Sequence, residues 1–109
     1  MPGVTHRVAE ARSLALHREV ALRLRAHPEL LERARARVEA WSRDRSVARV
    51  WVERWAVILR GSVDQVVAAI TDPGEEGRAL RQTSPFAGAV DPRTRWAILR
   101  AVGASEELP

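Results

Sequence analysis

Apolar residues recur at helical spacing through most of this 109-residue chain, and this periodicity limits the possible folds more than any other feature. After Pro28, the apolar residues Leu31, Ala34, Val38 and Trp41 follow one another at intervals of three, four and three residues. No stretch alternates polar and apolar residues for long, as a half-buried strand requires. The sequence therefore predicts an all-α protein, a single compact domain of five or six short helices.

Start and stop signals place three helices in the first half of the chain. The expected helices run from about His6 or Ser13 to Ala26, from Pro28 through Trp41, and from Val47 to Arg60. We expect Ser46 to cap the third helix and Gly61 to end it in the left-handed conformation. The apolar face of this helix should carry Val47, Val50, Trp51 and Ile58, with Trp55 near its edge.

Capping patterns open two further helices. Ser62 and Gln65 have the spacing of a capping box before a short helix over residues 63–70. The β-branched content of that segment also fits a strand. Asp72 and Glu75 repeat the capping-box spacing before a helix that continues through residue 81.

Two proline-containing boundaries enclose a connector that contains the only phenylalanine. Ser84-Pro85 disfavours helix, because proline lacks an N–H and restricts the residue before it. Asp91-Pro92 restarts a helix, with the aspartate as N-cap and the proline in the first turn. Between them, Phe86 lies among small residues. It either plugs the core of this chain or anchors a partner.

The last helix should end at Gly103. Residues 1–109 then form one helical domain, in which we expect residues 1–12 and 104–109 to be frayed.

All 18 basic residues are arginine, and cysteine is absent. Without cysteine there is no disulfide framework and no thiolate chemistry, which fits a reducing cytoplasm. The first residues lack the apolar run of a signal peptide, and no stretch reaches the length of a membrane span. We therefore expect a cytoplasmic protein without a membrane segment.

The charge is distributed unevenly. Residues 1–60 hold 13 arginines and 7 acidic residues, a net charge of +6, whereas residues 61–109 hold 5 arginines and 7 acidic residues, a net charge of −2. A basic half can follow nucleic-acid phosphates or face an acidic protein, or it can be a solvated helix surface with internal ion pairs. The residues assigned to nucleic-acid binding are Arg35, Arg37, Arg45 and Arg49.

No pattern in the sequence indicates catalysis. His6, His17 and His27 are spaced too irregularly for a metal site, and we interpret His17 as a satisfied polar residue at a helix contact. The acidic group Asp72, Glu75 and Glu76 is explained by the start of a helix, where the dipole stabilises anions. The sequence therefore predicts no enzyme, no metal and no cofactor.

Four tryptophans give the strongest packing signal. Trp41, Trp51, Trp55 and Trp96 are expected to form one aromatic core where the second, third and last helices meet. One of the pair Trp51 and Trp55 could instead reach the rim and contact a partner or a nucleic-acid base.

Three segments carry a resemblance to a known class of proteins: residues 13–18 (SLALHR), residues 28–34 (PELLERA) and residues 80–100. Together they resemble small helical antitoxins of bacterial two-gene toxin–antitoxin operons. The resemblance implies a protein-interaction module that neutralises a co-encoded toxin enzyme, of nucleotidyltransferase or ribonuclease type. The residues assigned to partner binding are Arg81, Ser84, Pro85, Phe86, Gly88, Arg95 and Trp96.

The alternative is a nucleic-acid-binding transcriptional regulator that uses the basic N-terminal half. Such a regulator would bind promoter DNA, and it could do so as a homo-oligomer. No helix-turn-helix pattern in the sequence identifies a recognition helix.

Overall fold

The computed structural model describes residues 2–107, which form six α-helices and no strand. The helices are α1 (Pro2–Ala26), α2 (Glu29–Asp44), α3 (Arg49–Leu59), α4 (Val63–Ile70), α5 (Glu75–Arg81) and α6 (Pro92–Glu107). The molecule measures 44 × 30 × 22 Å along its principal axes. The predicted all-α class is confirmed, and the strand alternative for residues 63–70 is wrong.

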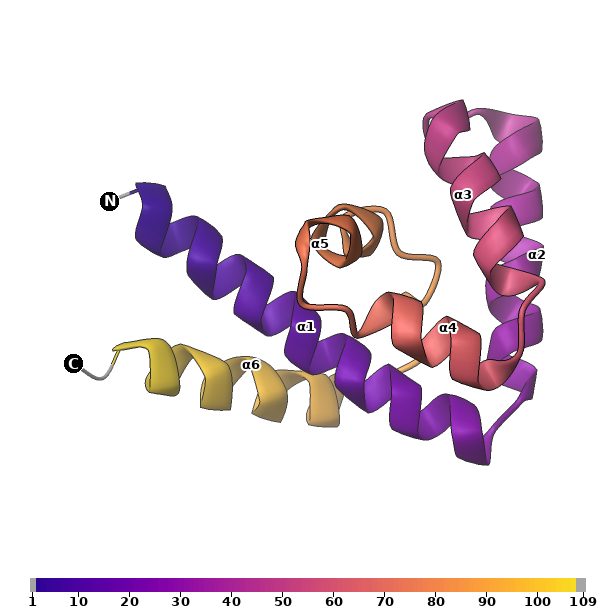
Figure 1. The fold of residues 1–109 in the computed structure, drawn as a ribbon. Helices are drawn as coiled ribbons and strands as arrows, with labels where there is room; N and C mark the ends of the chain where they lie inside the picture. The colour runs from indigo at the N-terminus through magenta and orange to yellow at the C-terminus, as the bar shows by residue number, and fades with distance from the viewer. Residues whose placement is uncertain (1, 108–109) are drawn as a thin grey trace.

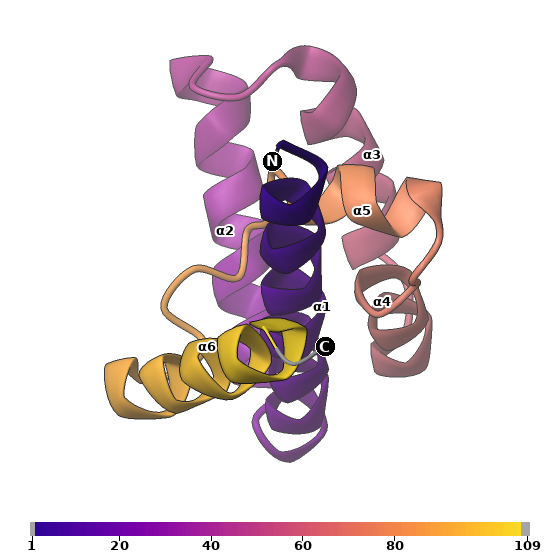
Figure 2. The same ribbon diagram turned by 90° about the vertical axis from the view of Figure 1, so that its left-hand side faces the viewer.

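The longest helix, α1, is the centre of the arrangement. It packs against α6, α4 and α5, while α2 packs mainly against α3 (Figures 1 and 2). α6 runs back beside α1, so the N-terminal end of α1 and the C-terminal end of α6 lie on the same side (Figure 1). The α2–α3 hairpin stands at the opposite side of the molecule, and its turn points away from α1 and α6.

The hydrophobic core is built around Trp55 of α3, which is fully buried. Its indole N–H donates to Thr83 Oγ1 at 3.1 Å, so the polar atom of the ring is satisfied inside the protein. The ring of Phe86 meets Trp55 edge-on, with centroids 6.1 Å apart. The same core includes residues from α1, α2 and α4. The connector between α5 and α6 therefore belongs to the core.

The predicted aromatic core of four tryptophans is wrong. Trp41 and Trp51 are only half-buried, and Trp96 is 62% exposed. α3 buries the face with Val52, Trp55 and Leu59 instead of the predicted one. Because eight of the eleven residues of α3 are apolar, periodicity alone could not select the inward face.

The capping box of α4 is confirmed by both of its reciprocal hydrogen bonds between Ser62 and Gln65. The predicted cap of α3 is wrong. Its N-cap is Ala48, without a side-chain hydrogen bond, because the N–H of Ser46 is held in the preceding turn by the carboxylate of Asp44 at 2.9 Å.

The other expected helix starts differ in outcome. Asp91 caps α6 as predicted and accepts a hydrogen bond from the N–H of Thr94 at 3.0 Å. α5 has no capping box: Asp72 accepts from the N–H of Gly74, and Gly74 becomes the N-cap without a side-chain bond. Pro28 lies one position before α2 and not in its first turn.

Two glycines do not end their helices as expected. Within residues 2–107 the left-handed backbone occurs only at Arg45 and Gly88, so Gly61 does not adopt it. Gly103 lies buried inside α6, where a Cβ atom would stand 3.1 Å from the guanidinium of Arg12 on α1. The predicted helix end at Gly103 is therefore wrong, because α6 continues past it to Glu107.

The two ends expected to fray, residues 1–12 and 104–109, are helical as far as the structure describes them. α1 begins at residue 2 and α6 continues to residue 107, and each helix packs against the other. Residues 1, 108 and 109 lie outside the described part of the chain.

Replacing Trp55 with alanine should destabilise the protein by about 3–5 kcal/mol, because it removes a buried ring and leaves Thr83 without its partner. The matched control is Trp96→Ala, which should change the free energy of unfolding by no more than about 0.5 kcal/mol, since that ring is 62% exposed. Chemical denaturation followed by circular dichroism measures both. Equal losses in the two variants would contradict the placement of Trp55.

Candidate functional site

The structure separates the seven residues predicted to bind a partner into two sets. The first set is buried or half-buried and consists of Arg81, Ser84, Pro85 and Phe86. Those on the surface are Gly88, Arg95 and Trp96. The Phe86 side chain is 6% exposed and packs on the central tryptophan, so it plugs the core and cannot reach a partner in this conformation.

Ser84 is held by a buried histidine that crosses from α1. Nδ1 of His17 lies 2.7 Å from the carbonyl oxygen of Ser13, and Nε2 lies 2.7 Å from the hydroxyl of Ser84. Because a carbonyl oxygen only accepts, Nδ1 carries the proton and Nε2 accepts from the serine O–H. The same hydroxyl oxygen accepts from the N–H of Phe86 at 3.2 Å. The predicted role of His17, a satisfied polar residue at a contact, is confirmed.

Burial lowers the pKa of His17 below its ordinary value of 6.5, and the nearby positive charge of Arg81 lowers it further. The hydrogen bond to Ser13 acts in the opposite direction, but the effect of burial is larger. The histidine is therefore neutral at pH 7, as the hydrogen bonds require.

The four arginines assigned to nucleic acid do not form one free basic surface. Arg35 donates to the carbonyl oxygen of Leu59 at 2.7 Å and pairs with Glu32, and Arg37 donates to the carbonyl oxygen of residue 87 at 2.9 Å. Arg49 pairs with a glutamate one turn away, residue 53, at 2.9 Å. Only Arg45, at the turn of the hairpin, has neither an ion pair nor a side-chain hydrogen bond with the described residues.

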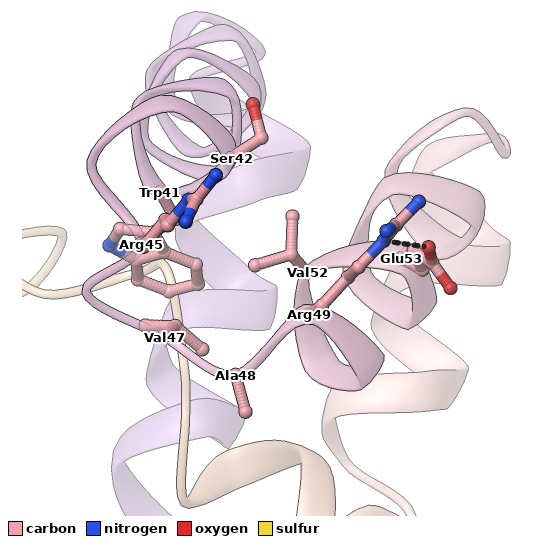
Figure 3. Close-up of a pocket in the computed structure, with 8 residues that line it drawn as sticks. All are labelled: Trp41, Ser42, Arg45, Val47, Ala48, Arg49, Val52 and Glu53. Carbon is pink, nitrogen blue, oxygen red and sulfur yellow. Dashed lines mark hydrogen bonds and ion pairs between the residues drawn. The ribbon is translucent and has the colours of Figure 1, made fainter.

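An open groove runs along the α2–α3 hairpin. Its wider part, about 760 Å³, lies at the turn, and a second hollow of about 280 Å³ follows between the two helices. Figure 3 shows the wider part, with Trp41 on the α2 side and Val52 on the α3 side of the opening. The apolar residues that line the two hollows are Trp41, Val47, Ala48, Val52, Val38, Ala56 and Leu59.

The rim of this α2–α3 groove is basic. Four of its charged side chains already have partners: Arg49 pairs with Glu53, Arg35 pairs with a glutamate on α2, and Glu39 pairs with an arginine outside the groove, residue 43. The remaining cations are Arg45 at the wide end and Arg60 at the narrow end, and neither has an ion pair with the described residues. This surface therefore presents an apolar floor between two arginines that have no ion pair with the described residues.

The outer side of α3 is also apolar. Val50 is 52% exposed and Val57 is 62% exposed. Between them, the guanidinium of Arg54 lies 5.2 Å from the ring centre of Trp51 and pairs with Glu76 of α5 at 3.1 Å. α3 thus keeps apolar side chains in solvent on a second side.

Other classes of site find no support in the described residues. Within that part of the chain no three histidines or carboxylates gather as a metal site would require. No described helix is both long and apolar enough to cross a membrane. Comparison with protein-family models, with curated proteins and with solved structures finds no match to this chain.

Sequence reasoning missed both the groove and the link between His17 and Ser84. The groove had a signal, because a helix as apolar as α3 should be buried on all sides in a chain this small. The histidine link had none, since the two residues lie 67 positions apart.

Lowering the pH from 7 to 5.5 should destabilise the protein. His17 in the unfolded chain takes up a proton near its ordinary pKa of 6.5, whereas the folded chain resists protonation, so stability present above pH 6.5 is lost as the pH falls. His17→Gln should flatten this pH dependence of the unfolding midpoint. A variant at residue 17 with the original pH profile would refute the assignment.

Proposed function

We propose that this chain is a protein-binding module that holds an amphipathic helix of a partner protein in the α2–α3 groove. The observation that carries the proposal is the apolar lining of this groove. Trp41, Val47 and Ala56 line it and are left half-buried by the rest of the chain. Exposed apolar surface of this kind typically marks an interaction site.

The length of the groove fits a helix. α3 has 11 residues, so at 1.5 Å per residue the groove beside it is roughly 16 Å long, or about three helical turns. A partner helix of that length would place apolar residues at positions i, i+3 or i+4, and i+7 over the floor. Val52 and Leu59 lie two turns apart on α3 and mark the two parts of that floor.

The arginines at the two ends of the groove indicate which charges the partner helix should carry. Arg45 and Arg60 lie at opposite ends of the groove and lack ion pairs with the described residues. Acidic residues near both ends of the bound helix would complement them, which increases the association rate and fixes the register. The proposed occupant is therefore an amphipathic helix with acidic residues near its two ends.

The resemblance to antitoxins indicates which partner the antitoxin form of this proposal requires, namely a toxin enzyme encoded beside this chain. Gly88, Arg95 and Trp96 supply a separate surface for the same enzyme, since Trp96 is 62% exposed at the start of α6. The role of a transcriptional regulator has less support, because three of the four arginines assigned to nucleic acid bind groups of this chain.

The test uses the proteins encoded by the genes on either side, each mixed with purified chain and measured by isothermal titration calorimetry. Arg45→Glu combined with Arg60→Glu should weaken binding at least about tenfold, because each end of the groove would then repel an acidic helix. The matched control is Arg33→Glu combined with Arg93→Glu, two exposed arginines that do not line the groove. It should change the dissociation constant less than about threefold.

Equal weakening by the two double variants would show unspecific charge attraction and contradict the groove. Loss of binding only on replacement of Trp96 and Arg95 would place the interface on α6 instead. Failure of both neighbouring proteins to bind would overturn the antitoxin form of the proposal.

A further inference from the structure

A second hollow lies on a different part of the molecule from the α2–α3 groove. It is a cleft of about 900 Å³ between α1, α6 and the connector of residues 82–91, with Arg81 at the connector's start. In Figure 2 the connector passes beside α1 before it enters α6. We infer that this cleft, called the α1–α6 cleft below, binds a small amphipathic anion through its carboxylate or phosphate group.

The charges of the α1–α6 cleft are unbalanced. Three arginines line it: Arg12 of α1, Arg81 of α5 and Arg95 of α6. Asp91 is the only carboxylate among the lining residues. Asp91 is already engaged, because it pairs with Arg23 at 2.9 Å and caps α6. Arg12 and Arg95 have no ion pair with the described residues, so the cleft holds positive charge without a counter-ion.

The strongest indication is the state of Arg81. Its side chain is 6% exposed, and its Nε is buried without a hydrogen-bond partner. Nη1 donates to the carbonyl oxygens of Ile70 and Asp72, at 3.2 and 2.6 Å, but no carboxylate pairs with the guanidinium. A buried, permanently charged group without a paired anion is costly, and an arginine cannot lose its proton to avoid that cost.

Two carbonyl oxygens supply hydrogen bonds but no negative charge, so they fix the position of Arg81 without neutralising it. An oxyanion in the cleft would neutralise it. Planar guanidinium groups match carboxylate and phosphate oxygens well, and a hydrogen bond to a charged group is stronger than one between neutral groups.

Apolar side chains also line the cleft, beside the arginines and a few neutral polar groups. They are Leu16 and Val20 of α1, Phe86 and Val90 of the connector, and Leu99 of α6. Leu16 and Leu99 are only half-buried, and a free inorganic anion would leave them so. A ligand with a short hydrocarbon body would cover them while its anionic head binds the arginines. In small-molecule sites, apolar side chains usually cover most of the ligand and a few polar groups fix its orientation.

The experiment uses octanoate and octyl phosphate as probes, with inorganic phosphate and neutral octanol as controls, in calorimetry on the full chain. Octanoate or octyl phosphate should bind more tightly than either control, because only these probes carry both an anionic head and an apolar body. The relative affinity of the two probes identifies the head group that the cleft prefers.

Matched variants locate the bound anion. Arg12→Gln combined with Arg95→Gln should weaken binding of the preferred probe at least about tenfold, since each arginine donates to a charged group. Arg93→Gln combined with Arg100→Gln removes the same charge from exposed positions of α6 outside the cleft, and it should have less than about a threefold effect. The Nε–H signal of Arg81 in NMR spectra should shift on titration with the probe.

Three results would overturn the inference: octanol binding as tightly as the anions, equal weakening by the two double variants, or no binding of either anionic probe at millimolar concentration. The outcome is distinguishable from that of the proposed function, because it is measured as binding of a small molecule and none of these variants replaces a residue that lines the α2–α3 groove.

Discussion

The burial of Trp55 is the interaction on which the rest of the structure depends. A fully buried indole needs apolar surface on all sides and an acceptor for its N–H, and one helical hairpin cannot supply both. The connector after α5 meets both needs, since Thr83 accepts the hydrogen bond and Phe86 covers one side of the ring. The link from His17 to Ser84 then ties this connector to α1. Residues far apart in the chain are thus joined around one side chain.

This use of the connector determines which surfaces remain for binding. Because Phe86 fills the core beside α3, it is not an exposed anchor, and the connector exposes Gln82, Ala87, Gly88 and Asp91 instead. The far end of the α2–α3 hairpin receives no such cover. Trp41 and Val47 stay half-buried there, beside the groove. In a chain of 109 residues there is too little material to cover both ends of α3.

The sequence predicted those parts of the fold that depend on local signals. The apolar stripe of α2 at Leu31, Ala34 and Val38, and the cap of α6 at Asp91, follow from spacing and residue type, and the structure confirms them. The inward face of α3 could not be predicted, because the choice depends on contacts of Trp55 with residues about thirty positions away. The α1–α6 cleft was missed for the same reason, since residues of α1, the connector and α6 line it. The wide part of the α2–α3 groove is lined by residues 41–53 alone, so it depends on how these two neighbouring helices pack.

The two candidate surfaces also differ in what supports them physically. The α2–α3 groove lies between two helices whose mutual packing leaves it open, so a partner adds apolar contact without displacing anything in the chain. The α1–α6 cleft instead contains Arg81, whose charge is already buried. An anion bound there would offset part of the cost of burying that charge, whereas a helix in the groove would cover apolar side chains that folding leaves half-buried. Either ligand would stabilise the folded chain, because each would bind the folded state alone.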